Sequence, residues 1–100
     1  MQIRFQPEAE AELAEARLWY ALQREGLDDE LMQRVDEALQ RIVDSPYAYQ
    51  VVYRKLRRAV LQQFPIAIFY FPVDDEIWVF GIYHSSRDPQ KLRWRKFRER

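Results

Sequence analysis

Basic side chains and one histidine stand at both ends of two apolar segments in the second half of the chain. Arg57 and Arg58 precede the first segment, and His84 and Arg87 follow the second. Arginine guanidinium groups bind phosphates and carboxylates, and they stabilise the charge of a phosphoryl-transfer transition state. Histidine titrates near neutral pH and can serve as an acid or a base. If the flanking strands share one sheet, these side chains converge at one edge and form a site for an anion.

The same residues also have purely structural interpretations. His84 can be a hydrogen-bonded residue at a strand end, and Arg87 can form an exposed ion pair with Asp88. One histidine and no cysteine argue against a metal site, and two glycines exclude a glycine-rich phosphate loop. Ser85 and Ser86 follow a strand but lack the elbow motif of serine hydrolases. The residues alone therefore contain no catalytic motif and predict neither a cofactor nor a metal.

Three strands are predicted around the apolar segments. They cover Leu56–Gln63, Ile66–Phe71 and Glu76–His84, with turns at Phe64-Pro65 and Asp74-Asp75. The middle strand is almost entirely apolar, which indicates a central strand covered on both faces. Pro72 cannot donate to a ladder and is expected to end that strand. The last strand has two alternating sets of side chains, and one set is expected to face a layer of helices.

Two helices are predicted in the first half of the chain, after a short strand at Gln2–Phe5. The first begins at Pro7 and ends near Gly26, and its apolar stripe consists of Ala9, Leu13, Ala16 and Tyr20, widened by Trp19 and Leu22. The second is capped by Asp28 or Asp29 and ends before Pro46. We expect one α+β domain over residues 1–100, with two layers: an N-terminal strand, an antiparallel helical hairpin and a three-strand antiparallel meander.

Charge is distributed unevenly along a chain that is neutral overall. Residues 1–46 carry five basic and eleven acidic side chains, whereas residues 47–100 carry eleven basic and five acidic. This asymmetry indicates an acidic partner for the basic half. No apolar run approaches the roughly 18 residues of a membrane span, and no secretory signal is recognisable. We therefore expect a cytoplasmic protein without a membrane partner.

Several short motifs together resemble the RelE/ParE superfamily of bacterial type II toxin–antitoxin toxins. They are Arg57-Arg58, Phe64-Pro65, Tyr70 and His84-x-x-Arg87-Asp88-Pro89, in this order, within LRRAVLQQFPIAIFY and DDEIWVFGIYHSSRDP. The resemblance implies a toxin, encoded on a plasmid or a chromosome, that forms a hetero-oligomer with a cognate antitoxin. The antitoxin would wrap the toxin with an acidic, partly disordered segment that folds on binding.

The superfamily contains two kinds of toxin, and the sequence favours the ParE-like kind. RelE-like members are metal-independent endonucleases that cut mRNA on the ribosome, whereas ParE-like members inhibit DNA gyrase without cleaving a bond. The resemblance offers Arg58, His84 and Arg87 as candidate catalytic residues for a nuclease. It also places Ala67 where nucleases have an arginine, and Arg93 where they have a tyrosine or histidine.

The expected function is therefore gyrase inhibition, as in plasmid-stabilisation systems, and not enzymatic catalysis. A RelE-like endonuclease and an inactive relic that only binds its antitoxin and regulates their operon remain the alternatives. The resemblance implies a surface that binds the target or the antitoxin, made of Arg57, Arg58, Tyr70, His84, Arg87, Lys91 and Trp94.

Overall fold

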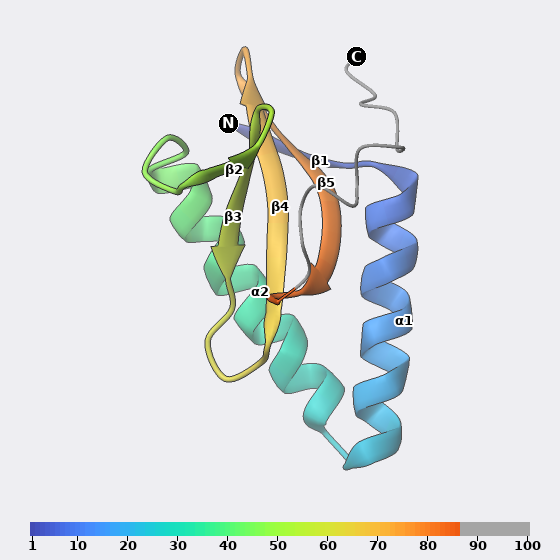
Figure 1. Cartoon of the computed structure of the whole chain (residues 1–100). Helices are drawn as coiled ribbons and strands as arrows, with labels where there is room; N and C mark the ends of the chain where they lie inside the picture. The colour runs from blue at the N-terminus through green and yellow to red at the C-terminus, as the bar shows by residue number, and fades with distance from the viewer. Residues whose placement is uncertain (87–100) are drawn as a thin grey trace.

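The computed structural model of the protein describes residues 1–86, and in these the chain forms one five-stranded sheet and two helices (Figure 1). In chain order the elements are β1 (Gln2–Phe5), α1 (Pro7–Gln23), α2 (Leu27–Asp44), β2 (Val51–Tyr53), β3 (Leu56–Val60), β4 (Ile66–Val73) and β5 (Glu76–His84). The strand order is β1-β5-β4-β3-β2, with β1 parallel to β5 and every other pair antiparallel. The α+β two-layer fold is thus confirmed. No helix among the described residues has the length and apolar character needed to cross a membrane.

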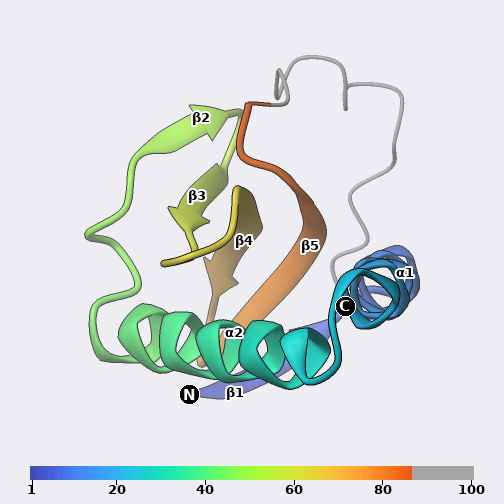
Figure 2. The same ribbon diagram turned by 90° about the horizontal axis from the view of Figure 1, so that it is seen from below.

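Both helices pack on one side of the sheet, α1 beside β5 and α2 across the middle strands (Figure 2). Pro7 begins α1 as predicted, since the first turn of a helix does not need its missing N–H. Gly26 does not end α1, which stops at Gln23; with a φ of 85° it is instead the residue that precedes α2. The predicted caps Asp28 and Asp29 lie inside the first turn of α2, where the helix dipole favours their charge.

The sheet contains two features that the predicted meander lacked. A short strand, β2, adds a fourth antiparallel strand at the edge next to β3. Pro72 lies within β4 and does not end it, because β4 continues to Val73. Pro72 is opposite Ile77 on β5 but beyond Tyr70, the last residue of β4 that is paired with β3. On that side the strand is locally an edge, where a missing N–H is tolerated.

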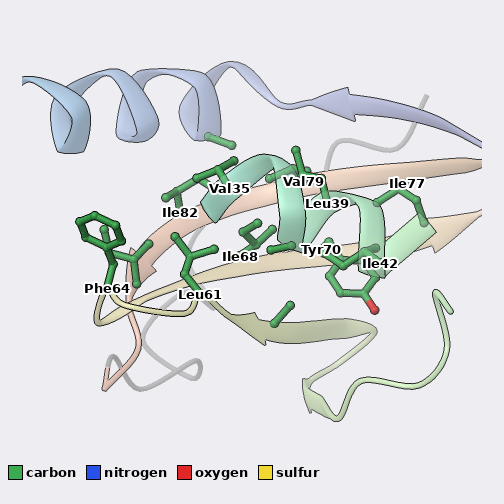
Figure 3. Packing of buried hydrophobic residues seen from close by; sticks show 14 of the residues in the cluster. Val35, Leu39, Ile42, Leu61, Phe64, Ile68, Tyr70, Ile77, Val79 and Ile82 are labelled. Carbon is green, nitrogen blue, oxygen red and sulfur yellow. The ribbon is translucent and has the colours of Figure 1, made fainter. Parts of the chain in front are cut away.

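The main core fills the space between the helices and the sheet (Figure 3). Its fully buried side chains come from both layers and include Leu31, Val35 and Ile42 of α2 and Ile68, Tyr70, Ile77 and Val79 of the sheet. From α1, Leu13, Ala16 and Tyr20 pack against it as predicted. Trp19 and Leu22 do not widen this stripe, since they are 56% and 76% exposed. The stripe of α1 is narrow because only one flank of the helix faces β5 and α2.

A second buried cluster lies on the opposite face of the sheet, and among residues 1–86 only strand residues form it. It consists of Leu56, Ala67, Phe69, Phe71, Phe80 and Tyr83. A β-bulge makes this cluster possible, because Phe69 is opposite Gly81 while Tyr70 is opposite Val79, which leaves Phe80 as the extra residue. The side-chain alternation of β5 therefore shifts at the bulge. Neither predicted set of alternating residues faces the helices along its whole length: Ile77 and Val79 do so before the bulge, and Ile82 after it.

Gly81 provides room for this second cluster. A side chain at position 81 would overlap the ring of Tyr83, which packs edge-to-face on Phe69 with the ring centroids 5.7 Å apart. The absence of a side chain at Gly81 thus lets Tyr83 cover the centre of the sheet.

Candidate functional site

Arg57 lies on the helix-facing side of β3 and binds the loop between α2 and β2. Its Nη1 donates hydrogen bonds to the backbone oxygens of Tyr47, at 3.1 Å, and Tyr49, at 2.7 Å. Its guanidinium carbon also lies 5.2 Å from the centre of the Tyr47 ring, within the range of a cation–π contact. The guanidinium of Arg57 is therefore engaged in holding a loop, which is a structural task.

Tyr70 is directly opposite Arg57 on β4 and is fully buried among the helix-side core residues. Its hydroxyl donates a 2.7 Å hydrogen bond to the backbone oxygen of Pro46, in the loop that follows α2. Burial of the phenol raises the pKa of Tyr70 to about 12, against the opposing effect of the Arg57 charge. In the described structure Tyr70 is thus a second anchor of the same loop and is not exposed to a partner.

Tyr70→Phe is expected to lower the free energy of unfolding by about 1 to 2 kcal/mol near pH 8, because the partly buried hydrogen bond to the backbone oxygen of Pro46 is lost. The raised pKa of Tyr70 means that the folded protein keeps a proton which the unfolded chain releases above about pH 10. The wild-type protein therefore loses the contribution of the Tyr70 hydroxyl to its stability as the pH rises from 10 towards 12. The variant lacks this hydroxyl, so its stability does not change for this reason. Urea titrations at pH 8 and pH 11 should show that the difference in free energy of unfolding between wild type and Tyr70→Phe becomes smaller at pH 11. An equal difference at both pH values would contradict the raised pKa of Tyr70.

Arg58 projects from the other face of β3, because it is opposite Phe69, a member of the second cluster. It is half-buried, and its side chain makes no hydrogen bond or ion pair within residues 1–86. Two further cations come from the turn between β2 and β3. Lys55 Nζ lies 4.3 Å from the centre of the Phe71 ring, and the Arg54 guanidinium lies 5.4 Å from that of Tyr53. We call Arg54, Lys55 and Arg58, with the Tyr53 ring, the basic sheet face.

Desolvation distinguishes Lys55 from an ordinary surface lysine. Partial burial lowers the pKa of Lys55, since removing water from an ammonium group disfavours its charged form. Because its ammonium group is already partly dehydrated and lies over the Phe71 ring, Lys55 loses less hydration when an anion binds. The ring contacts of Arg54 and Lys55 could not be predicted from the sequence, because they depend on the turn between β2 and β3.

His84 lies at the end of β5, opposite Ile66, and therefore on the helix-facing side. Its Nδ1 is 3.2 Å from the backbone nitrogen of Ser86 and 2.7 Å from the Ser86 hydroxyl. Because the backbone N–H can only donate, Nδ1 is the acceptor in that contact, and the ring proton of the neutral form resides on Nε2. The described part of the chain thus places His84 and Arg58 on opposite faces of the sheet.

Of the remaining residues singled out in the sequence, only Ala67 lies in the described part of the chain. Ala67, at the position of a nuclease arginine, is fully buried between Val60 and Tyr83 on the same face as Arg58. Arg87, Lys91, Arg93 and Trp94 lie outside the described residues. Within residues 1–86 no three His, Asp or Glu side chains come close enough together to hold a metal ion.

A groove of about 590 Å³ between α1 and the end of β5 was not predicted from the sequence. Strand β1 is paired with β5 only as far as Val79, so the edge of β5 beyond that residue faces α1 instead of another strand. Glu12 accepts a 3.1 Å hydrogen bond there from the backbone N–H of Ile82. Glu15, Trp19, Tyr20 and His84 also line the groove. Periodicity assigned Trp19 to the core, so its exposed position beside the groove was not predicted.

Comparison with known proteins was made by family model, by curated protein and by solved structure. The model for the ParE toxin of the type II toxin–antitoxin system parDE matches residues 3–89, whereas no curated protein matches. The structure of the chromosomal ParDE system from P. aeruginosa superposes with a TM-score of 0.70 at 18% identity, covering 84% of this chain and 95% of that one. The structure of the intact E. coli RelBE toxin–antitoxin complex superposes with a TM-score of 0.56 at 14% identity, covering 86% of this chain and 98% of that one.

At identities of 18% and 14%, these two structural likenesses show a shared fold and no more. The family model extends over most of the chain, from the first strand to just beyond the last one. The chain therefore belongs to the ParE toxin family of type II toxin–antitoxin systems.

Proposed function

We propose that this toxin inhibits DNA gyrase by binding it, without cleaving a bond, and that a cognate antitoxin neutralises it. The main support is the position of Arg58 and His84 on opposite faces of the sheet. A general acid or base and a charge-stabilising arginine must both reach the same phosphate, within roughly 3 Å of its atoms. Arg58 and His84 project from different faces, and the buried Ala67 supplies no cation beside Arg58.

The basic sheet face is our proposed binding site for the acidic segment of the antitoxin. It combines three cations with an aromatic ring, and within residues 1–86 the Arg58 guanidinium makes no hydrogen bond or ion pair. Arginine binds carboxylates in a two-pronged geometry, and such complementarity accelerates association with a partner of opposite charge. The complex would form in the bacterial cytoplasm, where gyrase also acts, and would stabilise a plasmid or chromosomal region that carries both genes.

Expression of the toxin without its antitoxin, followed by pulse-labelling of new DNA and new protein, tests this proposal. We expect DNA synthesis to fall first, with protein synthesis continuing for the early time points. Immediate arrest of translation with cleaved mRNA would instead support the endonuclease. Normal growth of cells that contain folded toxin would support a relic that binds only its antitoxin.

A further inference from the structure

The outer face of α1 is apolar, although it lies at the surface of the described structure. Five of the exposed side chains of this helix are apolar: Ala11, Ala14, Leu18, Trp19 and Leu22. In α2, by contrast, every exposed side chain is polar: Asp29, Gln33, Asp36, Gln40 and Asp44. Apolar side chains all round a helix are typical of a helix that is buried on both sides, so we expect a further surface to cover α1.

The exposed stripe lies opposite the buried stripe of the same helix. At about 100° per residue, Ala11, Leu18 and Leu22 fall within roughly 40° of one another, on the side of α1 away from the buried Ala9 and the core residue Tyr20. Figure 2 shows that α1 lies at the margin of the helical layer, with α2 and the sheet on one side of it. The outer stripe therefore contributes no residue to the main core and is available to another molecule.

We propose that a second copy of this chain covers the stripe, with the two α1 helices packed antiparallel around a two-fold axis. The order of side-chain sizes supports this partner, since the small Ala11 and Ala14 come first and the large Leu18 and Leu22 follow. A two-fold axis places the small side chains of each copy beside the large ones of the other, so that the two surfaces interdigitate. Parallel helices would instead oppose large side chains to large ones and leave a gap between the alanines.

The charges of α1 favour the same orientation. All acidic side chains of this helix lie in its N-terminal half, namely Glu8, Glu10, Glu12 and Glu15, whereas its one basic residue, Arg17, follows them. Parallel packing would bring the acidic halves of both copies together, whereas antiparallel packing places the acidic half of each copy towards Arg17 of the other. Arg17 is half-exposed, and its nitrogens are 3.8 and 3.7 Å from the carboxylates of Asp28 and Asp29. Such long, exposed ion pairs contribute little, so Arg17 can pair with a carboxylate of the second copy instead.

The proposed acidic segment of the antitoxin is a poorer match to this face of α1. It would meet like charge from the same glutamates, which costs affinity. The basic sheet face is on the other side of the sheet from both helices, so a dimer formed by α1 does not involve it. We therefore expect an assembly in which each of two toxin copies can bind an antitoxin. This inference does not depend on which cellular target the toxin binds.

Sedimentation equilibrium of the full-length toxin without its antitoxin tests the dimer. A contact made by one helix from each copy is small, below roughly 1,200 Å², and is expected to be weak. Between about 5 and 500 μM, the average mass of the wild-type protein should rise from that of one chain towards that of two. Leu18→Lys changes both halves of the interface and should weaken dimerisation at least about tenfold.

Val51→Lys is the matched control, because Val51 is also an exposed apolar residue and receives the same charge. It lies on β2, at the edge of the sheet, which is the other place where two copies could pair. We expect its dimerisation to stay within about twofold of the wild type. Circular dichroism verifies that both variants are folded.

The absence of cysteine in this chain allows the orientation of the helices to be tested with engineered disulfides. Ala11→Cys and Leu22→Cys are prepared as separate proteins and are oxidised in a glutathione buffer, each alone and as an equal mixture. In the antiparallel pair, position 11 of one copy is beside position 22 of the other, whereas the two copies of either position are roughly 16 Å apart along the helices. We expect at least about fivefold more mixed disulfide than either variant forms alone, because a disulfide does not span the longer distance.

Three results would overturn the proposal. The first is a protein that remains monomeric at about 500 μM, and the second is an equal loss of dimer in Leu18→Lys and Val51→Lys. The third is a mixed disulfide no more abundant than the disulfides within each variant. A monomeric toxin whose affinity for the antitoxin falls at least about tenfold in Leu18→Lys would assign the stripe to the antitoxin instead.

Discussion

Arg58→Glu is expected to weaken binding of the antitoxin by about 30-fold or more. Arg58 is half-buried on the basic sheet face and lies opposite Phe69 of β4. The other cations of this face, Arg54 and Lys55, come from the turn that leads into β3. A carboxylate at this position removes an attractive contact and adds a repulsive one towards an acidic segment, with a combined cost of about 2 kcal/mol. Isothermal titration of the toxin with the antitoxin encoded next to it measures this loss directly.

The matched control for this experiment is Arg41→Glu, in the last turn of α2. It changes the net charge of the protein by the same amount but lies in the helical layer. We expect its affinity to remain within about threefold of the wild type, and we expect the wild-type affinity to fall with rising salt more steeply than that of the Arg58 variant. An equal loss for both arginines would mean that overall charge, and not the basic sheet face, attracts the antitoxin.

Phe69→Ala is expected to lower the free energy of unfolding by about 3 to 5 kcal/mol, the largest effect on stability that we predict. Phe69 is fully buried at the centre of the second cluster, packed edge-to-face with Tyr83. Its truncation leaves a cavity and also removes the ring contact, in a protein whose total stability is expected to be only about 5 to 15 kcal/mol. The measurement is urea unfolding followed by circular dichroism.

Val60→Ala serves as the control for Phe69→Ala, because Val60 lies on the same face of the sheet but is 49% exposed. We expect it to change the free energy of unfolding by less than about 1 kcal/mol. A small effect of Phe69→Ala, similar to that of Val60→Ala, would show that the second cluster contributes little and that the helix-side core carries the fold.

Local signals in the sequence were sufficient to predict most of the elements. Pro7 starts the first helix, the second ends before Pro46, and the apolar segments around Ile68 and Val79 are adjacent strands. Such signals act within a few residues, so they do not specify the parallel pairing of β1 with β5. They also do not reveal that β4 is locally an edge at Pro72, which depends on where β3 begins.

The sequence could not determine which side chains project from which face of the sheet. The candidate site depends on this distribution. A single bulge at Phe80 changes which residues of β5 face the helices, and it places His84 on their side. Arg57 and Arg58 are adjacent in the sequence, yet one binds a loop and the other is part of the basic sheet face. Cross-strand register, which is a long-range property, therefore decides which of the basic residues can act together.

The most direct test of the proposed gyrase inhibition is a supercoiling assay with purified components. Relaxed plasmid, DNA gyrase and ATP are incubated with increasing amounts of the toxin, alone and after saturation with its antitoxin. We predict that the toxin alone blocks negative supercoiling near stoichiometric amounts and that the antitoxin restores it. Unaffected supercoiling at a large excess of toxin, together with cleavage of mRNA in a translation reaction containing the same preparation, would contradict the proposal.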